Sequence, residues 1–361
     1  MKNISRVKCR IENIIYKLIV ITLVLVGTII NTKNALINTV FASISMIILA
    51  VYIGKYTNLY SEYVGEKRGG LLSATLGNLP ELAMGIWSLG YGMVSMVKWA
   101  LIGSIISNML LVLGISSFVG GVKYKEQSFN KNIARTNFNM LTLALASMIL
   151  LATVNYYVPL SSEAISSISN KVAIVLIFVY GLGLIFSLVT HSNLFVVSED
   201  GNEVRNENKD RKIRILSIIL ILSLTLFFSS ENVINNLNEL VKVNGVSENL
   251  LGILVVPFIG NIGENISAIM AAFNDKINMS IEIAVGSSIQ IALFVTPIIM
   301  VLSYTMGITM NLLFSPVQII IALVAVAMSF IVYVDGKSYW FEGAILLAIY
   351  LMSIISCYYI I

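Results

Sequence analysis

Two short polar motifs, each ending in a glutamate, interrupt otherwise apolar stretches of this sequence. Gly77-Asn78-Leu79-Pro80-Glu81 is repeated 183 residues later as Gly260-Asn261-Ile262-Gly263-Glu264. The same offset places Gly103-Ser104 on Gly286-Ser287 without a gap. An acidic side chain is costly at the centre of an apolar helix, about 2.5–3.5 kcal/mol for Asp on insertion scales, and such residues are functional candidates. The repetition predicts one site shared by two related halves of the chain.

Neutral oxygen atoms accompany the two glutamates at helical spacing. Asn78 and Glu81 are three residues apart, as are Asn261 and Glu264, so each pair shares one face of a helix. The apolar segments that follow the motifs carry further oxygens, in Ser104, Ser107, Asn108, Ser287 and Gln290. A single serine in an apolar helix often only bonds to a neighbouring helix. The prediction of a site therefore depends on the whole set.

This set predicts a site for a hard cation. It offers only oxygen ligands, with a formal charge near −2 when both glutamates are ionised. Ca²⁺ takes six to eight oxygen ligands in flexible geometry, whereas Mg²⁺ tends to keep its waters. Zn²⁺ prefers His or Cys, which these segments lack. We expect Glu81 and Glu264 to be the metal ligands, with Na⁺ and Mn²⁺ as alternatives to Ca²⁺ and no resident cofactor.

Protons are expected to compete with the cation at the same carboxylates. Desolvation and repulsion between two close carboxylates both favour a protonated state when no cation is bound. A divalent cation then displaces the protons, and competition at one site produces exchange. Each charge moved against a potential of 100 mV costs about 2.3 kcal/mol, so export from a negative interior requires a coupled ion. A simple channel would run in the opposite direction.

The backbone beside the two glutamates is expected to be irregular. Pro80 lacks an N–H and frees a carbonyl one turn back, and Gly263 permits unusual backbone angles. Freed carbonyls within a membrane occur where the backbone lines a cavity or is buried in protein. An alternative interpretation is that both residues only kink their helices. Similarly, Gly103 and Gly286 have the alternative role of permitting close helix packing.

Composition identifies the chain as a helical membrane protein. It is 57% hydrophobic and 12% charged, with a mean hydropathy of +0.89, whereas soluble domains are about 25% charged. Long continuous apolar runs exclude a β-barrel, whose strands alternate. Cys9 and Cys357 lie at opposite ends and predict no disulfide framework, and the single histidine, His191, borders a polar loop. Nothing in the composition indicates a nucleic-acid partner.

Eleven membrane-spanning helices are predicted, each with about 20 apolar residues. Their spans are 14–31, 35–57, 70–91, 97–120, 136–155, 171–190, 214–234, 249–273, 278–303, 312–334 and 340–361. With the N-terminus in the cytoplasm, 19 of the 23 Lys and Arg residues lie on the cytoplasmic side, as the positive-inside rule requires. The N-terminal segment has the outline of a signal peptide, but no small-x-small cleavage site directly follows it, so we expect a retained helix. The predicted location is the plasma membrane.

The helices divide into an N-terminal helix and two repeats. The expected units are the N-terminal helix in 1–34, a first five-helix repeat in 35–190, a cytoplasmic linker in 191–213 and a second five-helix repeat in 214–361. Because five is odd, the second repeat enters the membrane from the opposite side. This inverted topology brings both glutamate motifs to the middle of the bilayer. No oligomeric state follows from the sequence.

A known family carries similar motifs. Gly77-Asn78-x-x-Glu81, GSIISNMLLVLG at 103–114 and GSSIQIALFV at 286–295 resemble the α-repeats of the Ca²⁺/H⁺ antiporters, members of the cation/Ca²⁺ exchanger superfamily. The resemblance covers most of 50–335. It implies a secondary transporter that exchanges Ca²⁺ for H⁺ by alternating access, with eleven helices. It also implies that Glu81 and Glu264 bind Ca²⁺ and carry protons, and that the second and seventh helices slide as gates.

Several residues depart from the family pattern. Asn265 stands where the family usually has His directly after the second glutamate, and Asn58 stands where its second helix usually has an acid. The acid of the seventh helix is retained as Glu231. The family's acidic cytoplasmic helix is only partly present, in residues 199–210. The first departure concerns a group that the resemblance implies in proton handling.

Three alternative functions compete with Ca²⁺/H⁺ exchange. Leu79-Pro80-Glu81 is similar to the Pro-Glu pair of the related Na⁺/Ca²⁺ exchangers, and together with Asn265 it makes Na⁺ coupling the main alternative. An intramembrane enzyme is disfavoured because the acids are glutamates and no His pair or Ser-His arrangement is present. A cation sensor that binds without transport is a third class. The expected partners are Ca²⁺, H⁺ and the lipid bilayer.

Overall fold

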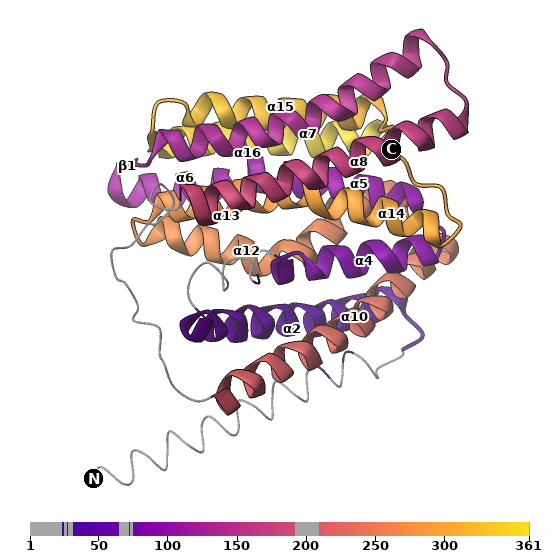
Figure 1. The fold of residues 1–361 in the computed structure, drawn as a ribbon, viewed down its shortest axis with the longest axis horizontal. Coiled ribbons are helices and arrows are strands. Elements are labelled where there is room, and N and C mark those ends of the chain that lie inside the picture. Colours follow the sequence, from indigo (N-terminus) through magenta and orange to yellow (C-terminus); the bar gives the residue numbers. More distant parts are fainter. Residues whose placement is uncertain are drawn as a thin grey trace.

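The fold is a bundle of long, roughly aligned helices, seen in a computed structural model (Figure 1). The structure describes Val24, Gly27, residues 32–64, Leu72, residues 75–191 and residues 209–360. The helices of the first half are α2 (Ala35–Val64), α4 (Leu79–Gly90), α5 (Val94–Ile106), α6 (Leu113–Tyr124), α7 (Lys131–Tyr157) and α8 (Ser162–Ile185). Those of the second half are α10 (Lys209–Asn244), α11 (Glu248–Leu250), α12 (Val256–Phe273), α13 (Ile277–Gln290), α14 (Thr296–Thr305), α15 (Pro316–Tyr333) and α16 (Trp340–Ile360).

Four π-helical segments and two short strands complete the described elements. The π-helices are η1 (Ser107–Val112), η2 (Phe186–Thr190), η3 (Leu251–Val255) and η4 (Ile291–Val295). Strands β1 (Glu126–Ser128) and β2 (Lys337–Tyr339) pair antiparallel, with Gln127 opposite Ser338. Each π-helix continues directly into a flanking α-helix, so α5, η1 and α6 form one span, as do α13, η4 and α14.

Nine helical spans in the described part of the chain are long and apolar enough to cross a membrane. Of the eleven predicted, the first, 14–31, lies outside the described residues apart from Val24 and Gly27, which are both helical. The third, 70–91, is interrupted by a turn at Asn78: Leu72 and residues 75–77 are helical before it, and α4 follows it from Leu79 to Gly90. Several helices are longer than predicted: α2 continues to Val64, α8 begins at Ser162, and α10 begins at Lys209, within the segment predicted as a linker. Residues 192–208 of that segment lie outside the described chain.

The boundaries of the elements follow the same offset of 183 residues as the motifs. Helix α4 ends at Gly90 and α12 ends at Phe273, and α5 begins at Val94 where α13 begins at Ile277. The π-helices η1 and η4 correspond in the same way and end at Val112 and Val295. The two halves therefore share one sequence of local structures, including a π-helix at the same place.

The two halves run in opposite directions through the membrane. The end of α6 meets the end of α12, where Tyr124 Oη donates to the carbonyl oxygen of Phe273 at 3.1 Å. Helix α4 ends where α5 begins, at the other end of the α5–α6 span. Helices α4 and α12 therefore end at opposite ends of the bundle and are antiparallel, although they correspond to each other in the repeat. At the opposite end, Lys98 Nζ near the start of α5 donates to the carbonyl oxygen of Leu313, 2.9 Å away, in the loop after α14.

Two large apolar clusters of buried residues form the interior of the described chain, and a third, of only Tyr63, Ile215 and Ile219, joins α2 to α10. The larger cluster joins α5 and α6 to α7, α8 and α13–α16. The smaller one joins α2 and α10 to α4, η3 and the start of α12. Figure 1 shows α2 and α10 side by side along one edge, with α4 and α12 between this pair and the remaining helices. The helices that carry the glutamates thus lie between the two clusters.

Candidate cation site

Each glutamate of the paired motifs lies against the glycine of the other motif. A methyl group built on Gly77 would lie 2.7 Å from Oε1 of Glu264, and one built on Gly260 would lie 2.6 Å from Oε1 of Glu81. A side chain at either glycine would occupy the space that the carboxylate uses. The two helices therefore cross at their motifs, and the carboxylates are close enough for Glu264 to act electrostatically on Glu81.

Three hydrogen bonds between candidate residues also join the two halves of the chain. Asn78 Nδ2 donates to Gln290 Oε1. Asn261 Nδ2 donates to Ser104 Oγ at 3.0 Å, and Asn108 Nδ2 donates to Ser287 Oγ at 3.0 Å. The first two bonds place the motif of each half against the following helix of the other half, and the third joins the two following helices to each other.

The amide groups are held in one orientation by these bonds. Because Asn261 uses its nitrogen as a donor, its carbonyl oxygen remains available. Asn261 Nδ2 has a second acceptor, the carbonyl oxygen of Pro257 at 3.1 Å. Ser287 also interacts with the Glu264 carboxylate.

Several buried oxygens at the site have no hydrogen-bond donor within the described chain. They are both carboxylate oxygens of Glu81, Oε2 of Glu264 and Oδ1 of Asn261. Buried polar atoms in native proteins nearly always have a partner, and an exception calls for an explanation such as an ion. All these atoms are acceptors, so a cation or a proton would satisfy them. Their chemistry fits the hard cation predicted from the sequence.

The candidate residues are mostly inaccessible, although the two carboxylates differ. Glu81 is 7% exposed, whereas Glu264 is only partly buried. Gln290 is partly buried. The other candidate residues are buried, namely Asn78, Ser104, Ser107, Asn108, Asn261 and Ser287. Ser107 begins η1, and no hydrogen bond joins its hydroxyl to another candidate residue in the described structure. Within that same part of the chain, no three His, Cys, Asp or Glu residues are grouped for a metal, so any cation here has two carboxylates and neutral oxygens.

The backbone is irregular at the first motif but regular at the second. Asn78 adopts φ −93° and ψ 12°, and α4 starts again at Leu79 with Pro80 in its first turn. In contrast, α12 runs without interruption through Gly263, so the expected irregularity there is wrong. Gly263 keeps its N–H and can remain helical, whereas Pro80 cannot donate to the carbonyl of Leu76.

Irregular backbone occurs instead beside the site in both halves. The π-helix η1 begins at Ser107, and η4 begins at Ile291, directly after Gln290. A third, η3, precedes α12. π-Helical turns are rare and are frequent at functional sites, because they shift side chains relative to a regular helix. The sequence offers no signal for these three segments.

Of Gly103 and Gly286, one has the alternative role of permitting close helix packing. A methyl group on Gly103 would lie 2.6 Å from the carbonyl oxygen of Ile253, so this glycine permits close packing of α5 on η3. A methyl group on Gly286 would meet no atom within 4 Å. Sequence reasoning also missed that Asn265, beside Glu264, has a buried Oδ1 without a donor in the described structure.

Comparison with known proteins agrees with this architecture. Residues 35–189 and 215–359 match a family model described as sodium/calcium exchanger protein. The chain is 37% identical over 324 residues to the Ca(2+)/H(+) antiporter of Aphanothece halophytica, covering 86% of this chain and 87% of that protein. It is 33% identical over 336 residues to the Ca(2+)/H(+) antiporter ChaA of Bacillus subtilis strain 168, covering 93% and 95%. The structure of native YfkE matches with a TM-score of 0.79 at 29% identity, covering 94% of this chain and 98% of that chain. The all-helical membrane fold predicted from the sequence is confirmed.

Proposed function

Because this chain belongs to the sodium/calcium exchanger protein family, whose members are membrane transporters and not enzymes, we propose that it exchanges Ca²⁺ for H⁺. The two relatives named above are Ca²⁺/H⁺ antiporters and align along most of their length. We place the protein in the plasma membrane with its N-terminus in the cytoplasm, on the distribution of basic residues. The exchange site is the set of oxygens around Glu81 and Glu264.

One observation carries the assignment of the site. Four buried oxygens from Glu81, Asn261 and Glu264 have no donor in the described chain. The carboxylates supply negative charge, and the amide oxygen supplies a neutral ligand that Ca²⁺ accepts. Glu81 and Glu264 bind the metal directly. The set of oxygen ligands is completed or oriented by Ser104, Ser107, Asn108, Ser287 and Gln290.

Exchange follows from competition between Ca²⁺ and protons for the same carboxylates. Without a cation, two close carboxylates in a low dielectric repel each other, and a proton relieves the repulsion. When Ca²⁺ binds, it takes the place of the protons, which leave on the side where Ca²⁺ entered. The inward movement of protons then drives Ca²⁺ out against the membrane potential.

Alternating access requires the site to open to one side of the membrane at a time. We propose that α2 and α10 slide against the helices that carry the glutamates. The smaller apolar cluster lies at this boundary, and apolar contacts are non-directional. A sliding pair can therefore exchange one set of apolar contacts for another with little change in energy.

The decisive experiment is Ca²⁺ uptake into proteoliposomes with a proton gradient or a sodium gradient imposed separately. Ca²⁺ flux that follows only the proton gradient supports the proposal and indicates that Asn265 does not prevent proton coupling. Flux that follows only the sodium gradient at fixed pH contradicts it and favours the Na⁺-coupled alternative, to which Pro80 and Asn265 point. Tight Ca²⁺ binding without flux under either gradient indicates a sensor.

Substitution of the two glutamates tests the site itself. Glu81→Gln and Glu264→Gln are each expected to abolish Ca²⁺ transport while membrane insertion remains normal, because an amide can neither hold the charge nor exchange the proton. Glu282→Gln is the matched control, since this membrane-embedded glutamate lies on α13 outside the oxygen set. The site is wrongly assigned if both variants retain coupled transport.

A further inference from the structure

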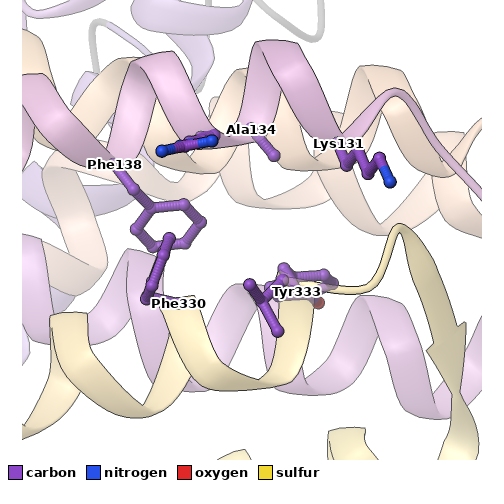
Figure 2. Close-up of a pocket in the computed structure, with 7 residues that line it drawn as sticks. Lys131, Ala134, Phe138, Phe330 and Tyr333 are labelled. Carbon is purple, nitrogen blue, oxygen red and sulfur yellow. The ribbon is translucent and has the colours of Figure 1, made fainter.

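A cavity of about 360 Å³ lies between α7 and α15, away from the glutamates. Phe138, Phe330 and Tyr333 form its apolar wall, and Lys131 and Arg135 lie at its polar side. Figure 2 shows Lys131 and Phe138 on one helix facing Phe330 and Tyr333 on the other. The cavity adjoins the β1–β2 end of the molecule, which the positive-inside pattern places in the cytoplasm.

The two cations of this cavity have no acidic partner. In the described part of the chain, no carboxylate lies within ion-pair distance of Lys131 or Arg135, and both side chains are exposed. Other basic residues nearby are engaged: Lys337 pairs with Glu126 at 2.9 Å, and Lys123 Nζ donates to a backbone carbonyl at 2.9 Å. Like charges four residues apart on a helix repel. An anion between them would remove this repulsion.

The first turn of α7 adds to the positive potential of the cavity. Lys131 is the first residue of α7 and Arg135 follows one turn later. The start of a helix carries partial positive charge and favours anions. Arg binds phosphate through two parallel hydrogen bonds, and Lys binds it as a point charge. The cavity therefore has the chemistry of a phosphate site.

The surroundings favour a lipid as the carrier of the phosphate. Exposed apolar side chains lie elsewhere on the same two helices, with Leu143 and Leu150 on α7 and Ile331 on α15. Val334, at the rim of the cavity, is 57% exposed. Basic pockets between transmembrane helices on the cytoplasmic side are typical positions for anionic headgroups. Acyl chains can cover the apolar faces while the headgroup enters the cavity.

We propose that the cavity between α7 and α15 binds the phosphate of an anionic phospholipid headgroup through Lys131 and Arg135. The ligand belongs to the cytoplasmic leaflet. Because α7 packs on α13, which carries Ser287 and Gln290, an occupied cavity would brace a helix of the exchange site. The binding site itself does not depend on which ions the protein exchanges.

Native mass spectrometry of the delipidated full-length protein, titrated with phosphatidylglycerol or phosphatidylcholine, tests this proposal. We expect preferential binding of phosphatidylglycerol, reduced roughly ten- to thirtyfold in Lys131→Gln/Arg135→Gln. The matched control is Lys125→Gln/Lys276→Gln, which removes the same charge from exposed positions on the same side. Equal losses in both double variants, or no loss in either, overturn the proposal.

Two further arms distinguish the cavity from surface charge and a lipid from a soluble anion. Val334→Trp keeps both cations but obstructs the rim, and it should weaken phosphatidylglycerol binding as well. If inorganic phosphate binds at these residues and phosphatidylglycerol is not preferred over phosphatidylcholine, the cavity is still a phosphate site, but its ligand is a soluble anion of the cytosol. If the Lys131→Gln/Arg135→Gln change alters the oligomeric mass and leaves lipid binding intact, the cavity is a contact between copies and the proposal fails.

Discussion

At the scale of single residues, the site depends on glycines as much as on the glutamates. Gly77 and Gly260 leave room for the carboxylate of the opposite repeat, and each carboxylate tip lies less than 3 Å from where a methyl group would be. Because the atom in the way is the end of a flexible side chain, a substitution there displaces a carboxylate and leaves the fold in place. The glycines thus determine where the negative charge lies.

Gly77→Ala and Gly260→Ala are therefore expected to weaken Ca²⁺ binding without unfolding the protein. Displacing one carboxylate ligand should raise the apparent KM for Ca²⁺ by roughly ten- to a hundredfold, as for a lost charged hydrogen bond of about 1.5–3 kcal/mol. Concentration-dependent Ca²⁺ uptake in proteoliposomes measures this change. Gly263→Ala is the control, because a methyl group there meets no atom within 4 Å. An equal effect in all three variants would contradict the role of the two glycines.

At the scale of elements, corresponding helices of the two halves are packed differently. Gly103 of α5 lies against the backbone of η3. A methyl group built on Gly103 would lie 2.6 Å from the carbonyl oxygen of Ile253. Gly286, its counterpart in α13, faces open space. Backbone atoms cannot move aside as a side chain can, so only the first helix is tightly constrained.

We expect Gly103→Ala to destabilise the protein and Gly286→Ala to be tolerated. Overpacking of this kind costs about 1–3 kcal/mol, whereas an alanine in an unobstructed helix is favourable by up to about 1 kcal/mol relative to glycine. The midpoint of thermal unfolding in detergent should fall in the first variant and stay equal or rise in the second. Similar midpoints for the two variants would count against the observed difference in packing.

A second feature at this scale is the short sheet that joins the two halves at one end. Glu126 in β1 accepts hydrogen bonds from Lys337 Nζ at 2.9 Å and Tyr339 Oη at 2.8 Å, both from β2. The bond with Lys337 lowers the pKa of Glu126, and the same bond raises the pKa of Lys337. Because the pKa of Glu126 is lowered in the folded state, the stabilisation that its bond with Lys337 gives the sheet is complete at pH values above the ordinary glutamate pKa of about 4.3. It is lost as the pH falls through the lowered pKa.

Acidification below the carboxyl range should therefore loosen the pairing of β1 with β2. Hydrogen exchange of the Lys337–Tyr339 amides, corrected for intrinsic rates, should accelerate as the pH falls, and added salt should reduce the difference because the pair is exposed. In Glu126→Gln this extra acceleration should be absent. The same pH dependence in that variant would show that another group controls the sheet.

At the scale of the whole molecule, the boundary for the proposed sliding movement lies between the α2–α10 pair and the helices that carry the glutamates, within the smaller apolar cluster. A directional contact crosses it: Trp87 Nε1 on α4 donates to the carbonyl oxygen of Phe227 on α10, at 2.8 Å. The rings of Trp87 and Phe227 also pack, with centroids 5.3 Å apart. This bond stabilises the present position of α10 relative to α4.

Trp87→Phe is expected to shift the population away from this conformation. Loss of one hydrogen bond of about 0.5–1.5 kcal/mol changes the population ratio up to roughly tenfold. Spin labels at the exposed positions Val243 and Tyr304 would report the shift as a second distance in pulsed electron resonance, after replacement of Cys9 and Cys357. Trp340→Phe is the matched control, since Trp340 packs on Phe118, outside the boundary. Unchanged distances in Trp87→Phe would mean that the bond does not restrain α10.

The sequence alone determined the class of protein and predicted the chemistry of its candidate site. Apolar runs long enough to span a membrane predict helices directly, and a glutamate within such a run is too costly to be incidental. The offset of 183 residues relates Glu81 to Glu264 and also relates the ends of α4 and α12. These inferences needed no tertiary information, because apolar spacing and internal repetition are properties of the chain itself.

The tertiary structure alone decided which groups meet. The contacts of Gly77 with Glu264 and of Gly260 with Glu81 join segments far apart in the chain, and their geometry depends on how two helices cross. The same holds for the packing difference between Gly103 and Gly286, whose local sequences are alike. Gly263 remained helical because a glycine only permits an irregular backbone and does not require one. Local sequence states what a residue can do, and packing against distant helices selects among those possibilities.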